Sequence, residues 1–133
     1  MTYYMAATLQ LPFDDAIQHT EAALKTEGFG IISRIDISQT LKSKIDVDFR
    51  PYVILGACNP QLAFEALQLE DKVGTMLPCN VVVQQLASGD VEIAAINPVA
   101  SMQSIENAEL TTAAEAVREK LARVIATLAD TAA

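Results

Sequence analysis

Two cysteines, each followed directly by an asparagine, are the residues best suited to chemistry in this sequence. They are Cys58-Asn59 and Cys79-Asn80. Asn59-Pro60 is typical of a helix start, with asparagine as the cap and proline at the first helical position. A thiol just ahead of a helix meets unpaired amide groups and the positive end of the helix dipole, which stabilise a thiolate. Cys58 is therefore the candidate reactive thiol.

The two segments meet only if the strands that carry them are neighbours. The apolar run 52–57 predicts a buried strand, and residues 81–86 and 91–96 predict a hairpin with a turn at Ser88-Gly89. If the first two strands are antiparallel neighbours, Cys58 lies beside Cys79. A two-residue turn would also place Asn80 opposite Asn97. The candidate binding residues are thus Cys58, Asn59, Cys79, Asn80 and Asn97.

Each of these residues also has a purely structural interpretation. Free cysteines often pack as small hydrophobic side chains in a core. Asparagines cap helices and occupy turns, although their amides can also donate to an oxyanion or a bound carboxylate. Both interpretations stay open from the sequence.

Neither thiol has an obvious catalytic base or metal-ligand set. The one histidine, His19, falls in the middle of a predicted helix and is expected to face solvent. Cys58 and Cys79 are 21 residues apart, which is not the spacing of a zinc motif, so no metal and no cofactor is expected. A reversible disulfide between them stays open, whereas a permanent one is not expected in a reducing cytoplasm.

Arg50 is a further candidate binding residue. It alternates with Asp46 and Asp48, so an extended segment would carry all three charges on one face. Such an arginine could bind a carboxylate ligand, or it could pair with Asp48 at a solvated edge.

The hydrophobic pattern predicts the elements that must position these residues. Strands are expected near 1–9, 31–37, 52–57, 81–86 and 91–96, and helices from 14 to 27, 38 to 45, 60 to 69 and 112 to 128. The last helix is expected to begin at Thr112, which forms a capping-box pattern with Glu115. The expected fold is α+β: one mixed, largely antiparallel sheet of about five strands with helices packed on it.

Composition limits the class of protein. The 133 residues suit a single domain, and 51% hydrophobic content is enough to bury a core. The net charge of −8 disfavours binding to nucleic acid. No apolar run approaches the length of a membrane span and no signal peptide is recognisable, so a cytoplasmic protein without a membrane partner is expected.

Two motifs resemble a bacterial and archaeal family known as domain of unknown function 302. They are Tyr-Val-Ile-Leu-Gly-Ala-Cys-Asn-Pro at 52–60 and Leu-Pro-Cys-Asn-Val-Val-Val at 77–83. Gly28-Phe29-Gly30, the connection into Pro51 and Ile96-Asn97-Pro98 follow in the family's order, and the resemblance covers about residues 3–128. It implies a small α+β fold that forms a homodimer and has no assigned activity. The family often has aspartate where Asn97 stands, which weakens an acid/base role there.

Three functions are consistent with these observations. The first is a dimeric module that binds a small anionic or sulfur-bearing ligand in a pocket made by the Cys-Asn segments. The second is a thiol-based redox or sulfur-handling protein, with Cys58 as thiolate and Cys79 as its partner. The third is a structural homodimer. Binding is favoured, because no base, metal set or cofactor motif is present.

Overall fold

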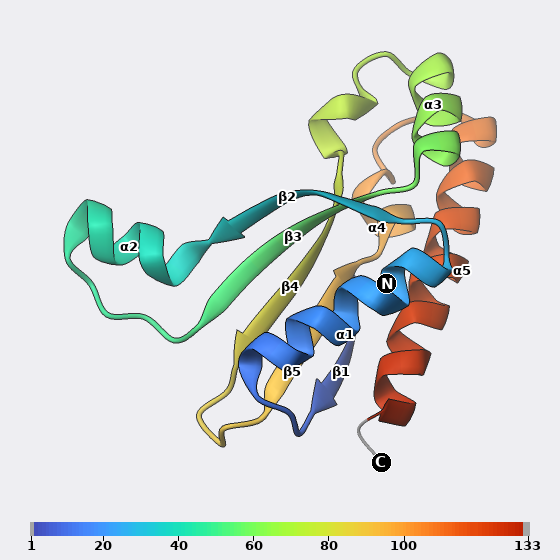
Figure 1. Cartoon of the computed structure of the whole chain (residues 1–133). Helices are drawn as coiled ribbons and strands as arrows, with labels where there is room; N and C mark the ends of the chain where they lie inside the picture. Colours follow the sequence, from blue (N-terminus) through green and yellow to red (C-terminus); the bar gives the residue numbers. More distant parts are fainter. Residues whose placement is uncertain (1, 132–133) are drawn as a thin grey trace.

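The computed structural model describes residues 2–131, which form one five-stranded antiparallel sheet and five helices (Figure 1). The strand order is β1-β5-β4-β3-β2. The strands are β1 (Tyr4–Leu9), β2 (Gly30–Asp36), β3 (Tyr52–Cys58), β4 (Cys79–Gln85) and β5 (Val91–Ile96). The helices are α1 (Phe13–Thr26), α2 (Ile37–Ile45), α3 (Pro60–Leu69), α4 (Pro98–Ser101) and α5 (Ala108–Thr131), and a 3-10 turn, η1 (Val73–Met76), follows α3. The predicted α+β fold is confirmed.

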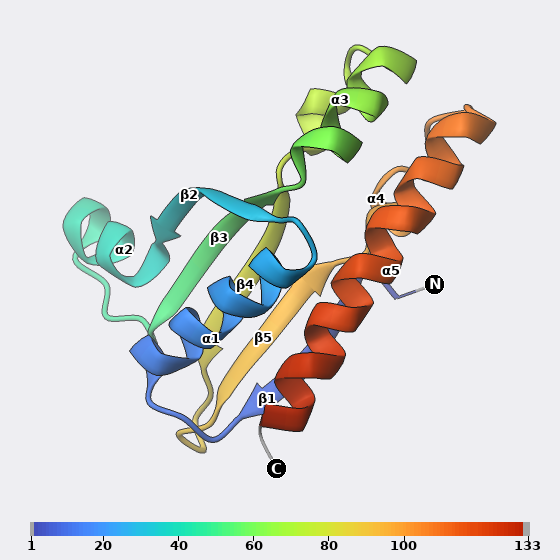
Figure 2. The same cartoon turned by 45° about the vertical axis from the view of Figure 1, so that its right-hand side comes forward.

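One face of the sheet carries α1 and α5, which lie side by side across it (Figure 2). Alternate strand residues point toward these helices and form the main core, as the two-residue period of a strand requires. This core includes Val53, Leu55, Val81, Val83, Val91, Ile93, Leu24, Leu121 and Leu128. Among residues 2–131, no helix is long and apolar enough to cross a membrane.

Gly28 ends α1 and turns the chain into β2. Its φ of 85° is in the left-handed region, where glycine carries no Cβ penalty. The backbone amides of Gly28 and Phe29 donate to the carbonyls of Lys25 and Leu24 at 3.1 and 3.0 Å, which is the Schellman arrangement. This turn starts β2 beside the end of β3, where Gly30 pairs with Cys58.

Among residues 2–131, no helix covers the opposite face of the sheet. The continuous apolar run of β3 predicted a strand buried on both faces. The core-facing residues Val53, Leu55 and Ala57 are buried, whereas Tyr52 and Ile54 on the opposite face are half-buried. β3 lies inside the sheet, between β4 and the edge strand β2, and β4 is the middle strand. The run therefore reflects an apolar open face rather than a second layer of helices.

The β4–β5 hairpin has a different register from the predicted one. The loop has three residues, Ala87 to Gly89, closed by a bond from the Leu86 amide to the Asp90 carbonyl at 2.8 Å. Gly89 takes a φ of 93°, as this hairpin type requires. Pairing is shifted by one residue, so Val81 faces Ala95, and the predicted pairing of Asn80 with Asn97 is wrong. A one-residue shift moves every side chain to the other face.

The last helix begins four residues earlier than predicted. Asn107 caps α5, and its side-chain oxygen accepts from the amides of Glu109 and Leu110 at 3.1 Å each. Thr112 is inside the helix, where its hydroxyl donates to the Ala108 carbonyl. The predicted capping box is therefore wrong, because asparagine caps a helix at least as well as threonine does.

The long helix α5 joins two separate hydrophobic clusters. Its C-terminal half packs into the main core, whereas Leu110 and Ala114 near its start belong to a second cluster with Ala66, Val73 and Met102. This second cluster lies beyond the end of the sheet, among α3, η1, α4 and the start of α5.

Candidate functional site

A pocket of about 330 Å³ lies between the two hydrophobic clusters. Phe29, Ala57, Cys79 and Val117 line it from the main core, and Ala66, Met102, Leu110 and Ala114 line it from the second cluster. Its other lining residues are Ile32, Cys58, Asn59, Leu62, Ala63, Leu67, Gly74, Leu77, Pro78, Pro98 and Ala113. None of these described lining residues is charged, so the pocket is an apolar space.

Cys58 and Cys79 both line this pocket. The strands β3 and β4 are antiparallel neighbours, and Ala57 pairs with Cys79 at their ends, so Cys58 lies one residue beyond that pair. Paired residues share a face and successive residues alternate, so the two thiols are not the directly opposed pair that a cross-strand disulfide uses. Both thiols are free.

The environment of Cys79 favours its neutral form. This residue is buried, with an exposed fraction of 8%. Burial raises the pKa of the Cys79 thiol to about 11, and the nearby Cys58 adds to the effect. At neutral pH, Cys79 therefore presents a protonated thiol to the pocket, which is a poor nucleophile.

Asn59 holds the backbone around the pocket. Its side-chain oxygen accepts from the Leu62 amide at 3.3 Å and caps α3. Its side-chain nitrogen donates to the Glu27 carbonyl, also at 3.3 Å, and so ties α3 to the end of α1. Asn59 therefore lines the pocket in a fixed orientation, and these two bonds leave one N–H and one oxygen lone pair of its amide.

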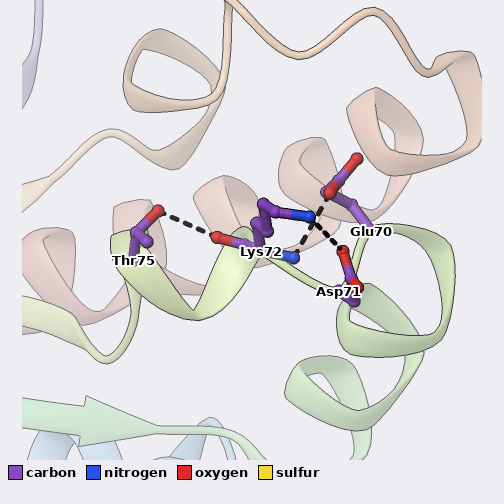
Figure 3. A network of polar contacts seen from close by, with 4 residues as sticks. All are labelled: Glu70, Asp71, Lys72 and Thr75. Carbon is purple, nitrogen blue, oxygen red and sulfur yellow. Dashed lines mark hydrogen bonds and ion pairs between the residues drawn. The ribbon is translucent and has the colours of Figure 1, made fainter.

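The turn η1 carries part of the pocket wall. The Lys72 amide donates to the Glu70 carboxylate at 3.2 Å, and the Thr75 hydroxyl donates to the Lys72 carbonyl at 2.8 Å (Figure 3). An exposed ion pair between Lys72 and Asp71 adds little to stability. These bonds hold the turn in which Val73 is buried and Gly74 faces the pocket.

Asn80 and Asn97 lie outside the pocket lining. Asn80 is exposed and borders a hollow on the open face of the sheet. Asn97 is buried and caps α4: its oxygen accepts from the Val99 amide and its nitrogen donates to the Thr2 carbonyl, both at 3.1 Å. Successive side chains of a strand point to opposite faces, so Asn80 leaves the sheet on the face away from Cys79.

Arg50 lies at the opposite end of β3 from Cys58. β3 itself spans roughly 20 Å from Tyr52 to Cys58, at about 3.3 Å per residue, and Arg50 precedes Tyr52 by two residues. Its guanidinium carbon is 4.3 Å from the centre of the Phe49 ring, and its Nε donates to Gln84 at 2.8 Å. The predicted alternative partner, Asp48, pairs instead with Lys42 at 3.2 Å. Arg50 is therefore not part of the pocket.

A comparison with known families matches residues 5–128 to "Domain of unknown function DUF302". The chain belongs to the DUF302 family. The resemblance carried by the two Cys-Asn motifs is thus confirmed. A solved relative, an uncharacterised conserved DUF302 protein from Bacillus stearothermophilus, is 29% identical and superposes with a TM-score of 0.89. The alignment covers 96% of this chain and 99% of that one. No curated protein matches.

The rest of the pocket in this DUF302 protein could not be found by inspecting motifs. Met102 directly follows α4, and Leu110 and Ala113 belong to α5, all more than 20 residues after Cys79 in the chain. Their only signal is that Leu110, Ala114, Val117 and Leu121 continue one helical stripe. Within residues 2–131, no group of three or more His, Cys, Asp or Glu side chains is arranged to hold a metal ion.

Proposed function

We propose that this protein binds a small molecule in the pocket between its two hydrophobic clusters. The supporting observation is an apolar space of about 330 Å³, at the lower end of the range for ligand pockets. The pocket opens to solvent, and its lining residues Ile32 and Leu67 are 64% and 44% exposed. A bound molecule would remove this apolar surface from water, which is favourable.

Binding is better supported than catalysis. The described lining residues include no carboxylate, imidazole or ammonium group that could transfer a proton. A thiol reaction, the second chemistry considered, would depend on Cys58 alone, because Cys79 stays protonated near neutral pH and does not face Cys58 directly across the strands.

The test is saturable binding of a neutral apolar fluorescent dye, such as N-phenyl-1-naphthylamine. We expect one dye per chain in the wild-type protein. Ala63→Trp should fill the pocket and abolish binding, whereas Phe64→Trp should leave it unchanged, because Phe64 is 58% exposed on the same helix. Equal dye binding by both variants would show that the dye does not bind in this pocket.

We further propose that a second copy of the chain covers the open face of the sheet. Ile35 is 47% exposed there, and it continues across the sheet into the half-buried Ile54 and Val82, which pair in turn on β3 and β4. The nine residues of α2 are all half-buried or exposed, and the segment projects from the body of the molecule (Figure 1). A row of apolar side chains across an uncovered sheet face is suited to an interaction site, and a twofold dimer would pair identical rows.

Measurement of molecular mass in solution tests the dimer. We expect twice the mass of one chain for the wild type. Val82→Lys should give the monomer mass, because it places a charge in the middle of the open face. Ala122→Lys, at an exposed position on α5, should remain dimeric. A wild-type protein with the mass of one chain at high concentration would refute the proposal.

A further inference from the structure

We propose that the molecule bound in this pocket is neutral and mainly aliphatic, with no ionised group inside the protein. This inference rests on the proposed binding function and names the chemical class of the ligand. It departs from the anionic ligand that the Cys-Asn motifs indicated, because those motifs do not assemble into a cluster of amide donors in the pocket.

The shape of the lining favours an aliphatic molecule. Small residues from two facing helices form one slot: Ala63 and Ala66 on α3, and Ala113 and Ala114 on α5. Leucine and methionine side chains surround it, at Leu62, Leu67, Leu77, Leu110 and Met102. Phe29 is the one aromatic residue among the described lining residues. Contacts with a bound molecule would thus be dispersion contacts with flexible alkyl groups.

The polar groups near the pocket are already satisfied. Both ends of the Asn59 amide hold backbone groups, so its position is fixed and only one N–H and one oxygen lone pair remain for a ligand. Among the described residues, every buried side-chain nitrogen or oxygen atom has a hydrogen-bond partner. An ionised ligand would lose its hydration and meet no charged side chain in the described lining, which is strongly unfavourable.

The surroundings of Cys79 and the net charge of the chain both disfavour an anionic ligand. The buried Cys79 thiol resists ionisation, with a pKa of about 11, because its surroundings do not stabilise negative charge. A carboxylate in the same place would meet the same penalty. The net charge of −8 also repels an anion as it approaches, most strongly at low salt.

A matched pair of ligands tests this inference. 1-Decanol and decanoate share a ten-carbon chain and differ in the charge of the head group at pH 8. We expect decanol to displace the bound dye with an affinity at least tenfold higher than that of decanoate. Decanol should also slow alkylation of Cys58 and Cys79, read out by peptide mass, because both line the occupied space.

A charge-introducing variant makes the test independent of ligand solubility. Ala113 is half-buried on the pocket wall, so a lysine there can keep its alkyl chain in the wall while its ammonium reaches the pocket mouth. Ala113→Lys should shift the preference toward decanoate by tenfold or more. Ala122→Lys, which adds the same charge on an exposed part of α5, should keep the wild-type preference.

The outcomes separate this inference from the function it rests on. Wild-type preference for decanol, together with a tenfold or greater shift toward decanoate in Ala113→Lys, supports a neutral ligand. Decanoate that binds as tightly as decanol overturns the neutral class and leaves small-molecule binding intact. A protein that binds the dye but neither ten-carbon compound overturns the aliphatic class. Absence of dye binding would refute the proposed function itself.

Discussion

At the scale of single residues, Cys79 links the pocket to the pH dependence of stability. Its folded pKa of about 11 lies above the value of 9.0 for an unperturbed thiol, so the folded protein holds the proton more tightly than the unfolded chain. The stabilisation is complete below pH 9 and is lost as the pH rises toward 11. Between pH 9 and pH 11, we expect the free energy of unfolding of the wild type to fall by about 2–3 kcal/mol more than that of Cys79→Ala.

Urea unfolding from pH 8 to 11 measures this difference. The cavity that alanine leaves lowers the free energy of unfolding by the same amount at every pH. It therefore does not affect the slope of the free energy against pH, which is the quantity compared. Cys58→Ala should retain most of the wild-type slope, because burial is the main cause of the raised pKa of Cys79 and Cys58 the lesser one. Identical slopes for the wild type and Cys79→Ala would show that the thiol ionises normally in the folded state.

Gly56 permits the close packing of three segments behind the pocket. A Cβ at this position would overlap the Ser33 hydroxyl and approach Pro78 Cγ to 2.8 Å. Gly56→Ala should therefore destabilise the protein by about 1–3 kcal/mol, the usual range for overpacking a rigid site. Ser33→Gly should recover part of the loss by removing the hydroxyl.

The matched control is Gly30→Ala, measured by the same thermal or urea unfolding. A Cβ on Gly30 meets no atom within 4 Å, although it lies in the neighbouring strand β2. We expect a change of less than about 0.5 kcal/mol there, as at other surface positions. Equal effects at Gly56 and Gly30 would mean that strand glycine content, rather than the close approach, determines stability.

At the scale of elements, the cap of α5 differs between the sequence-based prediction, Thr112, and the structure, Asn107. Asn107 accepts from two helix amides, and its side-chain nitrogen donates to the Leu69 carbonyl at 3.2 Å, so it also joins α5 to the end of α3. Asn107→Ala should cost about 1–2 kcal/mol, at the upper part of the range for caps. Thr112→Ala should leave the free energy of unfolding in urea nearly unchanged. A larger loss of stability from Thr112→Ala than from Asn107→Ala would contradict the assignment of Asn107 as the cap.

Local signals predicted the elements well and their ends less well. The strand at 52–58, the cap at Asn59 and the helix of α3 follow from short-range patterns, because each depends on residues within one or two turns. The predicted start of α5 was wrong because Asn107 and Thr112 are both acceptable caps. The contact of Asn107 with Leu69, 38 residues away in the chain, favours Asn107.

The candidate site was less predictable than the fold for the same reason. The neighbourhood of Cys58 and Cys79 followed from a hairpin and an antiparallel pairing. Asn80 lies away from Cys79 because the two are successive residues of one strand. The predicted pairing of Asn80 with Asn97 depended on the length of one turn, and Ala87-Ser88-Gly89 is compatible with two- and three-residue loops. Arg50 was excluded only by its distance along β3, and the helical wall of the pocket has no motif.

At the scale of the whole molecule, the pocket is the gap that α5 bridges between two clusters. Filling this gap should stabilise the fold and remove its binding capacity, a trade-off common at functional sites. Ala113→Leu adds apolar groups to the wall at a half-buried position, and we expect a gain of about 1 kcal/mol in the free energy of unfolding, or a few degrees in melting temperature. Dye and decanol binding should weaken at least tenfold in the same variant. Ala122→Leu, on the exposed side of α5, should change neither the free energy of unfolding nor the binding affinity. A loss of stability in Ala113→Leu without loss of binding would show that ligands do not bind in the space between the clusters.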